Sequence, residues 1–235
     1  MKDVAAHLLD GNLKRLSMQR DGFFGISAPT SGSYGDFLDF INRNNAEWVQ
    51  AARRLSPRML IDLIETTSRQ VADLFAKLDP YVPAMWAVSW AGESQSSNWF
   101  DIAREYTERW HHQQQIRVAV QKPGISTQEL FGPVLETFVR GLPHAFRGMN
   151  AESSSVVELE ITGEAGGRWF LEKAGSGWQL IAHAKPPAAK LRIDQELAWR
   201  VFTKAVDPAT AQGQVAVEGD HGLGLRILSL VAVLA

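Results

Sequence analysis

Residues 108–115 read Glu-Arg-Trp-His-His-Gln-Gln-Gln, and this stretch indicates both a local fold and a chemistry. Glu108 and His112 stand four positions apart. On an α-helix this spacing places two side chains on one face, with their Cβ atoms about 5–6 Å apart. A carboxylate and an imidazole in that arrangement can hold one metal ion together. A polar helix face without a metal would show the same spacing, so two ligands alone do not define a site.

The surrounding segment is predicted to be a helix from Asn98 to about Gln121, because it contains neither Gly nor Pro. Asn98 is a suitable N-cap, and Asp101 and Glu105 place negative charge in the first turns, where the helix dipole favours it. The Lys-Pro-Gly sequence at 122–124 predicts where the helix stops. The candidate ligand pair therefore lies within a long helix.

The composition is that of an ordinary globular protein, with 45% hydrophobic and 21% charged residues among 235. The net charge of −2 argues against nonspecific nucleic-acid binding, which usually needs a basic excess. There is no cysteine, so disulfides, thiolate metal ligands and cysteine nucleophiles are excluded. The sequence shows no signal peptide and no apolar run of the ~20 residues that a spanning helix needs. We therefore expect a cytoplasmic protein with no membrane partner.

The first 150 residues are predicted to be helical, because apolar residues recur at intervals of three and four. Ser56 and Pro57 mark one helix start, as N-cap and first helical residue. A loop is expected at 22–33, and a long connection that carries Trp86 and Trp90 at 80–97. The expected helices, besides the one that begins at Asn98, run from residue 1 to about 16, and over 34–55, 57–78 and 127–146.

After Asn150 the pattern changes to short strands separated by turn sequences. The expected strands are 156–161, 169–171, 178–181, 188–193 and 214–217, and the expected helices are 195–206 and 223–234. Strands combined with helices in this order predict an α+β fold. The polar stretch near Asn150 predicts two domains, a helical bundle at 1–150 and an α+β domain at 151–235.

The chain has six histidines, of which two lie in the stretch at 108–115. His7 lies on an apolar helix, where a histidine is most often a hydrogen-bonded core residue. It is nevertheless the best candidate for a third ligand, because a bundle projects ligands inward from facing helices. His111 would form an alternative Glu-x-x-His pair with Glu108, as in di-iron bundles, but those need a second such motif. The remaining histidines are His144, His183 (expected on a strand) and His221 (expected in a turn). None of the three has a second potential metal ligand at a suitable spacing in the sequence.

Three segments of the chain resemble the mycothiol-dependent maleylpyruvate isomerase family, which belongs to the DinB-like metalloenzyme superfamily of four-helix bundles. They are Lys-Asp-Val-Ala-Ala-His-Leu-Leu-Asp-Gly at 2–11, Arg-Asp-Gly at 20–22, and residues 108–117. The second half is similar to the sterol-carrier-like domain that follows the bundle in this family. That similarity rests on Gly-Arg-Trp at 167–169, Leu191–Asp194, Ala-Trp-Arg at 198–200 and Gly219-Asp220.

The resemblance implies a metal site formed by His7, Glu108 and His112, with Gln115 at a position where superfamily members often carry glutamine. Zn²⁺ is the first choice for these nitrogen and oxygen ligands, and Ni²⁺, Fe²⁺ or Mn²⁺ are alternatives. The cosubstrate implied is mycothiol or another small thiol, used for isomerisation or S-transfer on a small electrophile. The family's first bundle helix precedes the motif that begins here at Met1, so the expected bundle lacks that helix.

Two other functions remain open on the sequence alone. The chain could be a non-catalytic two-domain protein that binds a metal or a small molecule. It could also be a stress-associated protein without a substrate, although no basic patch supports DNA binding. The expected partners are a small-molecule substrate and a thiol, without nucleic acid, and the expected assembly is a monomer or a homodimer.

Overall fold

The computed structural model describes residues 1–26, 33–182 and 185–233. This part of the chain has a mixed α+β fold, as the sequence predicts, with helices in the first half and a sheet in the second. The predicted strand position of His183 lies outside the described residues, as does the middle of the predicted loop at 22–33. None of the helices in the described ranges combines the length and apolar character that a membrane crossing requires.

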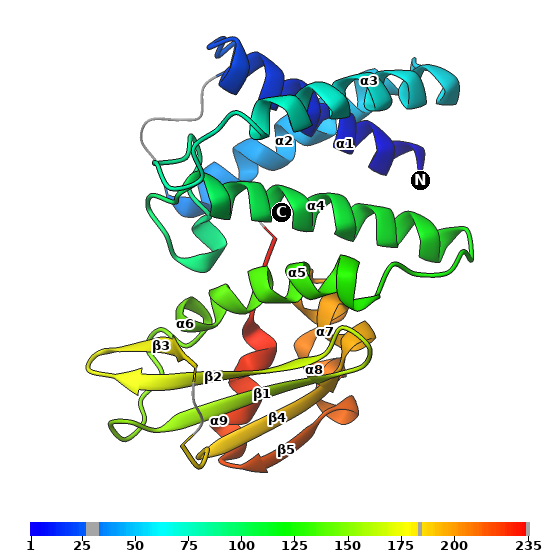
Figure 1. The fold of residues 1–235 in the computed structure, drawn as a ribbon. Coiled ribbons are helices and arrows are strands. Elements are labelled where there is room, and N and C mark those ends of the chain that lie inside the picture. Colours follow the sequence, from blue (N-terminus) through cyan, green and yellow to red (C-terminus); the bar gives the residue numbers. More distant parts are fainter. Residues whose placement is uncertain (27–32, 183–184, 234–235) are drawn as a thin grey trace.

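Helices form most of the first half. They are α1 (Lys2–Lys14), which continues as a π-helical turn η1 (Arg15–Arg20), α2 (Tyr34–Ala52), α3 (Pro57–Phe75), α4 (Asn98–Ala119), α5 (Gln128–Phe138) and α6 (Leu142–Ala145). Figure 1 shows α1, α2 and α3 together at one end of the molecule, with α4 below them. α1 packs against both α2 and α3 around a small core. The fully buried residues of that core are Ala6, Leu9, Ala52 and Leu60.

The predicted start of α3 is confirmed, because the Ser56 hydroxyl accepts a hydrogen bond from the Met59 amide at 3.2 Å. The N-cap predicted for α4 is wrong by one residue. Ser97 is the N-cap, and Asn98 instead donates its side-chain amide to the carbonyl of Asp79 at 2.8 Å. This bond ties the start of α4 to the end of the preceding helical segment.

Three predicted helices end earlier or are interrupted. After α2 and α3 the last predicted turns are closed by hydrogen bonds to carbonyls three residues back, such as Leu55 to Ala52 at 3.0 Å. The helix predicted at 127–146 breaks into α5, a 3₁₀ turn η3 (Val139–Gly141) and α6. Pro143 explains the break, because it has no amide hydrogen to donate to a carbonyl in the preceding turn.

A five-stranded sheet forms the other end of the molecule, and it has the order β3-β2-β1-β4-β5. The strands are β1 (Val156–Thr162), β2 (Gly167–Ala174), β3 (Gly177–Ile181), β4 (Ala189–Asp194) and β5 (Ala216–Gly219). β1 pairs in parallel with β4, and the other neighbours are antiparallel. The parallel pair is reached by a crossover through the β2–β3 hairpin.

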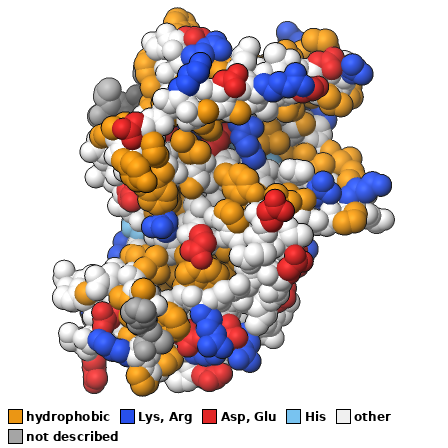
Figure 2. Space-filling model, in the orientation of Figure 1, with side chains coloured by type: hydrophobic (Ala, Val, Ile, Leu, Met, Phe, Trp, Pro, Cys, Tyr) orange, Lys and Arg blue, Asp and Glu red, His pale blue; other side chains and the backbone are white. Residues whose placement is uncertain are grey.

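The two faces of the sheet differ in chemistry. On β1, Val157, Leu159 and Ile161 are buried in the main core, whereas Glu158 and Glu160 face the other side. There Glu160 pairs with Lys190 at 2.5 Å and with Arg192 at 3.2 Å. Figure 2 shows acidic and basic side chains next to each other over the strands. This alternation is the period-two pattern of a sheet with one covered face.

The C-terminal helices are shorter than predicted. They are α7 (Gln195–Phe202), α8 (Pro208–Ala211) and α9 (His221–Arg226), with 3₁₀ turns η4 (Gln212–Gln214) and η5 (Ile227–Ser229). The helix predicted at 223–234 forms only in its first part, as α9 and η5, because the chain becomes extended at Leu230 and the amide of Ala232 donates to the carbonyl of Phe202 at 2.8 Å. Leu230 and Ala232 are buried, so this segment contributes to the core as an extended strap.

The main hydrophobic core joins α4, α5 and α6 to the covered face of the sheet and to α7 and α9. Its largest fully buried side chains include Phe131, Phe138 and Phe202. The core therefore includes elements on both sides of residue 150. The predicted boundary follows the change from helix to sheet, and the division into two independently folding units stays a prediction.

Candidate metal centre

The structure brings together His7, Glu108 and His112, the three residues predicted as metal ligands. His7 comes from α1, and the other two come from one face of α4, where α1 packs against it. One ligand atom from each residue lies within 4.8 Å of the others. All three side chains are half-buried, so the cluster lies between the helices but is accessible to solvent.

The rings and the carboxylate face each other closely. Nε2 of His112 lies 3.4 Å from Oε2 of Glu108. The rings of His7 and His112 have their centroids 4.9 Å apart and are nearly perpendicular, at 75°. A tetrahedral ion with bonds of ~2.0–2.1 Å places its ligand atoms about 3.3 Å from one another. The Glu108–His112 pair already has this separation.

The third ligand also fits. All ligand atoms lie within 4.8 Å, so the most separated pair needs to approach by no more than ~1.5 Å to reach a shared ion. Rotations of these half-buried side chains about their χ angles can cover such a distance. A donor set of two imidazoles and one carboxylate is typical of catalytic zinc sites, which leave a position free for water or substrate. The residues present therefore fit a divalent cation.

Gln115 completes the arrangement around His112. Its Oε1 atom lies 2.9 Å from Nδ1 of His112. The amide oxygen can only accept, so Nδ1 of His112 carries a proton in this arrangement and Nε2 is the atom that faces Glu108. Hydrogen bonds of this kind fix the tautomer and orientation of metal-binding histidines. This contact gives a physical role to Gln115, which matches a glutamine that is frequent in the superfamily that the chain resembles.

The electrostatics of Glu108 and His112 are those of a coupled pair. Burial disfavours the imidazolium of His112, but the hydrogen bonds to Glu108 and Gln115 outweigh it and raise its pKa. Burial likewise disfavours the carboxylate of Glu108, yet the hydrogen bond from His112 and its charge lower that pKa. In the metal-free protein a proton on His112 thus occupies the place that a cation would take.

The other two histidines of the cluster region stay neutral. Burial, and then the positive charge of His112, lower the pKa of His7. The same causes lower the pKa of His111 to about 4. His111 is 5% exposed, and neither of its ring nitrogens has a hydrogen-bond partner among the described residues. It packs beside Trp199 and outside the ligand cluster.

A buried ion cluster beside the site holds α1 against α4. Arg15 is 3% exposed and donates two hydrogen bonds to Asp101, at 2.6 and 2.8 Å, and one to Glu105 at 3.2 Å. Its guanidinium lies 4.5 Å from the ring centroid of Trp86 and 5.2 Å from that of Phe75. The bidentate hydrogen bonds and the neighbouring aromatic rings fix both the position and the orientation of the Arg15 guanidinium. We call Arg15, Asp101 and Glu105 the clamp.

The sequence had not revealed the clamp. Asp101 and Glu105 were interpreted as charges that favour the helix dipole, whereas the structure pairs both with Arg15 from the other helix. A second polar contact supports the same interface, because Arg109 donates to Asn12 at 2.5 Å and to Glu105 at 3.1 Å. The spacing of Asp101, Glu105 and Arg109 on one helix face was the available signal.

The remaining histidines lie elsewhere. His221 is the first residue of α9, and His144 lies in α6 beside a separate cavity. Within the described ranges, neither joins a group of potential metal ligands.

Comparison with known proteins does not extend this description. No known protein family matches the chain, and no curated protein matches its sequence. The family resemblance noted in the sequence stays a prediction.

Proposed function

We propose that this chain binds one divalent cation through His7, Glu108 and His112 and uses it to activate a small thiol. The observation that carries the proposal is the convergence of these three ligands from two helices, with Gln115 fixing the tautomer of one of them. Zn²⁺ is the first choice of ion for this donor set, and Ni²⁺, Fe²⁺ or Mn²⁺ are alternatives. A DinB-like bundle would place its ligands on facing helices in the same way.

A bound cation would favour deprotonation of a coordinating thiol or water molecule. His7 and His112 would hold the ion from opposite helices, and Glu108 would supply the negative charge that reduces the net charge of the centre. Gln115 keeps the proton of His112 on Nδ1, and the clamp keeps α1 at a fixed distance from α4. The chain contains no cysteine, so any thiolate must come from a cosubstrate such as mycothiol or another small thiol.

The reaction proposed is addition of the thiolate to a small electrophile, followed by isomerisation or by retention of the conjugate. The test is thiol-dependent conversion of an activated alkene by the metal-loaded protein, followed as conjugation, which consumes thiol, or as isomerisation of the alkene, which returns it. We expect turnover that needs both metal and thiol, and that is lost in Glu108→Gln and His112→Ala but retained in His144→Ala. Stoichiometric metal without thiol-dependent turnover on any electrophile would contradict catalysis and leave a metal-binding protein.

A non-catalytic binding protein is the second candidate. It is favoured by a cavity that shares no residue with the three ligands, which means that the fold can hold a small molecule away from the metal centre. The same turnover experiment separates the two candidates.

A further inference from the structure

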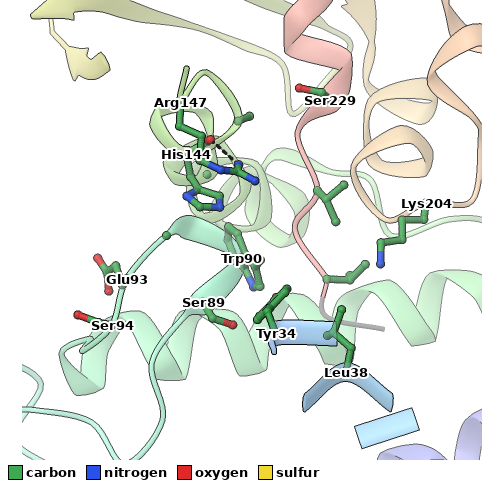
Figure 3. Close-up of a pocket in the computed structure, with 15 residues that line it drawn as sticks. Tyr34, Leu38, Ser89, Trp90, Glu93, Ser94, His144, Arg147, Lys204 and Ser229 are labelled. Atoms are coloured by element: carbon green, nitrogen blue, oxygen red, sulfur yellow. Dashed lines mark hydrogen bonds between the residues drawn. The ribbon is translucent and has the colours of Figure 1, made fainter. Parts of the chain in front are cut away.

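A cavity of about 570 Å³ lies where the helical half meets the C-terminal strap. Its walls come from the start of α2, the 3₁₀ turn η2 (Ser89–Ala91), α6 and the segment 229–233. Figure 3 shows the labelled side chains around it. The volume lies within the range of about 300–1,000 Å³ that is typical of small-molecule sites. None of its lining residues belongs to the metal cluster, so the inference stands apart from the proposed function.

The floor of the cavity is aromatic. Trp90 is 6% exposed and stacks edge-on against Phe100, with ring centroids 6.0 Å apart. Its position is tight, because a side chain at Gly141 would meet the indole ring at about 3.1 Å. The indole N–H is shielded from water and has no acceptor among the described residues, which is costly for a buried donor. Tyr34 is 55% exposed and adds a second ring at the rim.

Two cations line the cavity on opposite sides. Figure 3 shows Arg147 beside His144 on one side of Trp90 and Lys204 on the other side, beyond the strap. Arg147 donates to the carbonyl of its neighbour His144 at 2.8 Å, and within the described ranges neither cation has a carboxylate partner. Glu93 is the acidic residue of the lining, and it is engaged by the hydroxyl of Ser96. The lining thus carries two positive charges and one negative charge.

The backbone at Lys204 is unusual. Its φ is +62°, a left-handed conformation that glycine adopts most easily and that costs roughly 1 kcal/mol for other residues. The position follows the end of α7, where a glycine would serve as well for chain reversal. Local stability therefore does not explain why position 204 is a lysine. A lysine, unlike a glycine, places an amino group at the cavity.

His144 forms part of the cavity wall next to Arg147 (Figure 3). Burial, and then the charge of Arg147, lower its pKa, so the ring is neutral near pH 7 and adds no charge. It packs against Gly92, whose φ is +85° and where any added side chain would clash with Nδ1 of His144. Two independent features, the left-handed glycine and the close approach, keep this wall in place.

We infer that the cavity binds a small aromatic monocarboxylate, with its ring against Trp90 and Tyr34 and its carboxylate between Arg147 and Lys204. The net single positive charge of the lining matches one negative charge. A phosphate monoester would bring nearly two negative charges at pH 7 and is matched less well. Guanidinium and ammonium groups both recognise carboxylates through charge-assisted hydrogen bonds.

The test is calorimetric titration of the full-length protein with 1-naphthoate, and with 1-naphthalenemethanol and 1-naphthylmethylamine as neutral and cationic analogues of similar shape. We expect saturable binding of the carboxylate, much weaker binding of the alcohol and none of the amine. Arg147→Gln and Lys204→Gln should each weaken naphthoate binding about tenfold, since each removes one charged hydrogen bond. Arg69→Gln, which removes an exposed cation on α3, is the matched control and should change nothing.

Both substituted side chains are exposed, so the variants should fold, and circular dichroism checks this. Equal binding of the carboxylate and the alcohol, no saturable binding, or unchanged affinity in both variants would overturn the proposal. The titration is repeated with His7→Ala, where naphthoate affinity should be unchanged. A loss there would place the ligand at the metal centre instead, so failure of this inference and failure of the proposed function give different results.

Discussion

The amide oxygen of Gln115 lies 2.9 Å from Nδ1 of His112, one turn further along α4. This contact orients the imidazole so that Nε2 faces Glu108, at 3.4 Å. It selects Nε2 rather than Nδ1 as the nitrogen that His112 can offer to a cation. The proposed metal centre would thus be prepared by a residue that does not itself contact the ion.

Gln115→Leu should lower the affinity for Zn²⁺ by about 10–100-fold, because the tautomer and orientation of His112 are no longer fixed. The measurement is a competition titration against a chromogenic chelator. Gln113→Leu is the control, since Gln113 is exposed on the same helix and its substitution should leave affinity unchanged. Equal affinities of the two variants would show that the hydrogen bond does not prepare the site.

Metal affinity should rise with pH up to the raised pKa of His112, by up to tenfold per pH unit, because the cation must displace a proton from that residue. The sign follows from the pKa shifts. The pKa of His112 is raised, whereas those of His7 and Glu108 are lowered, so only His112 holds a competing proton near neutrality. Calorimetry in buffers of different ionisation enthalpy measures the proton released. Binding without proton release in this range would contradict the assignment of His112.

Arg15→Met should destabilise the fold by up to about 3–5 kcal/mol, because the buried carboxylate of Asp101 loses its bidentate partner and keeps only Arg104, while Glu105 keeps only Arg109. It should also weaken metal binding, since the clamp sets the distance between His7 and the α4 ligands. The measurements are chemical denaturation and a metal titration under conditions where the variant is folded. Arg53→Met is the control, because its pair with Asp3 is exposed, and it should change stability little. A folded Arg15→Met protein with unchanged metal affinity would limit the clamp to stability.

His111→Leu should leave metal binding intact and make the metal-free protein less sensitive to acid. The folded pKa of His111 is about 4, below its usual value of 6.5, so the unfolded chain takes up a proton first as the pH falls. Stability is therefore lost between these two values, by up to about 3 kcal/mol for this residue. Denaturation at several pH values compares the variant with the wild type. Parallel pH profiles would show that His111 does not contribute.

The sequence predicted best where local signals act alone. Ser56 and Pro57 define the start of α3 through a cap and a fixed backbone angle, and both depend only on neighbouring residues. The pairing of Glu108 with His112 likewise follows from helical spacing. His7 needed more than spacing, because its meeting with α4 depends on how two helices pack.

The features that were predicted wrongly or missed all depend on tertiary contacts between distant parts of the chain. The strap after Ser229 has a uniformly apolar sequence that is compatible with a helix, but the acceptor at Phe202 and the core around Leu230 and Ala232 favour an extended chain. Arg15 could not be matched to Asp101 from sequence, because the two are 86 positions apart. Long-range pairing of this kind leaves no periodic signal.

The central claim is tested most directly by the metal content of the purified protein and its variants, measured by mass spectrometry after dialysis. The account predicts one divalent cation per wild-type chain, and loss of that ion in His7→Ala and His112→Ala. Full occupancy is predicted in His111→Leu and His144→Ala, which are matched controls on α4 and α6. Absence of stoichiometric metal from the wild type after loading, or equal retention by all four variants, would contradict the assignment of His7, Glu108 and His112 as a metal centre.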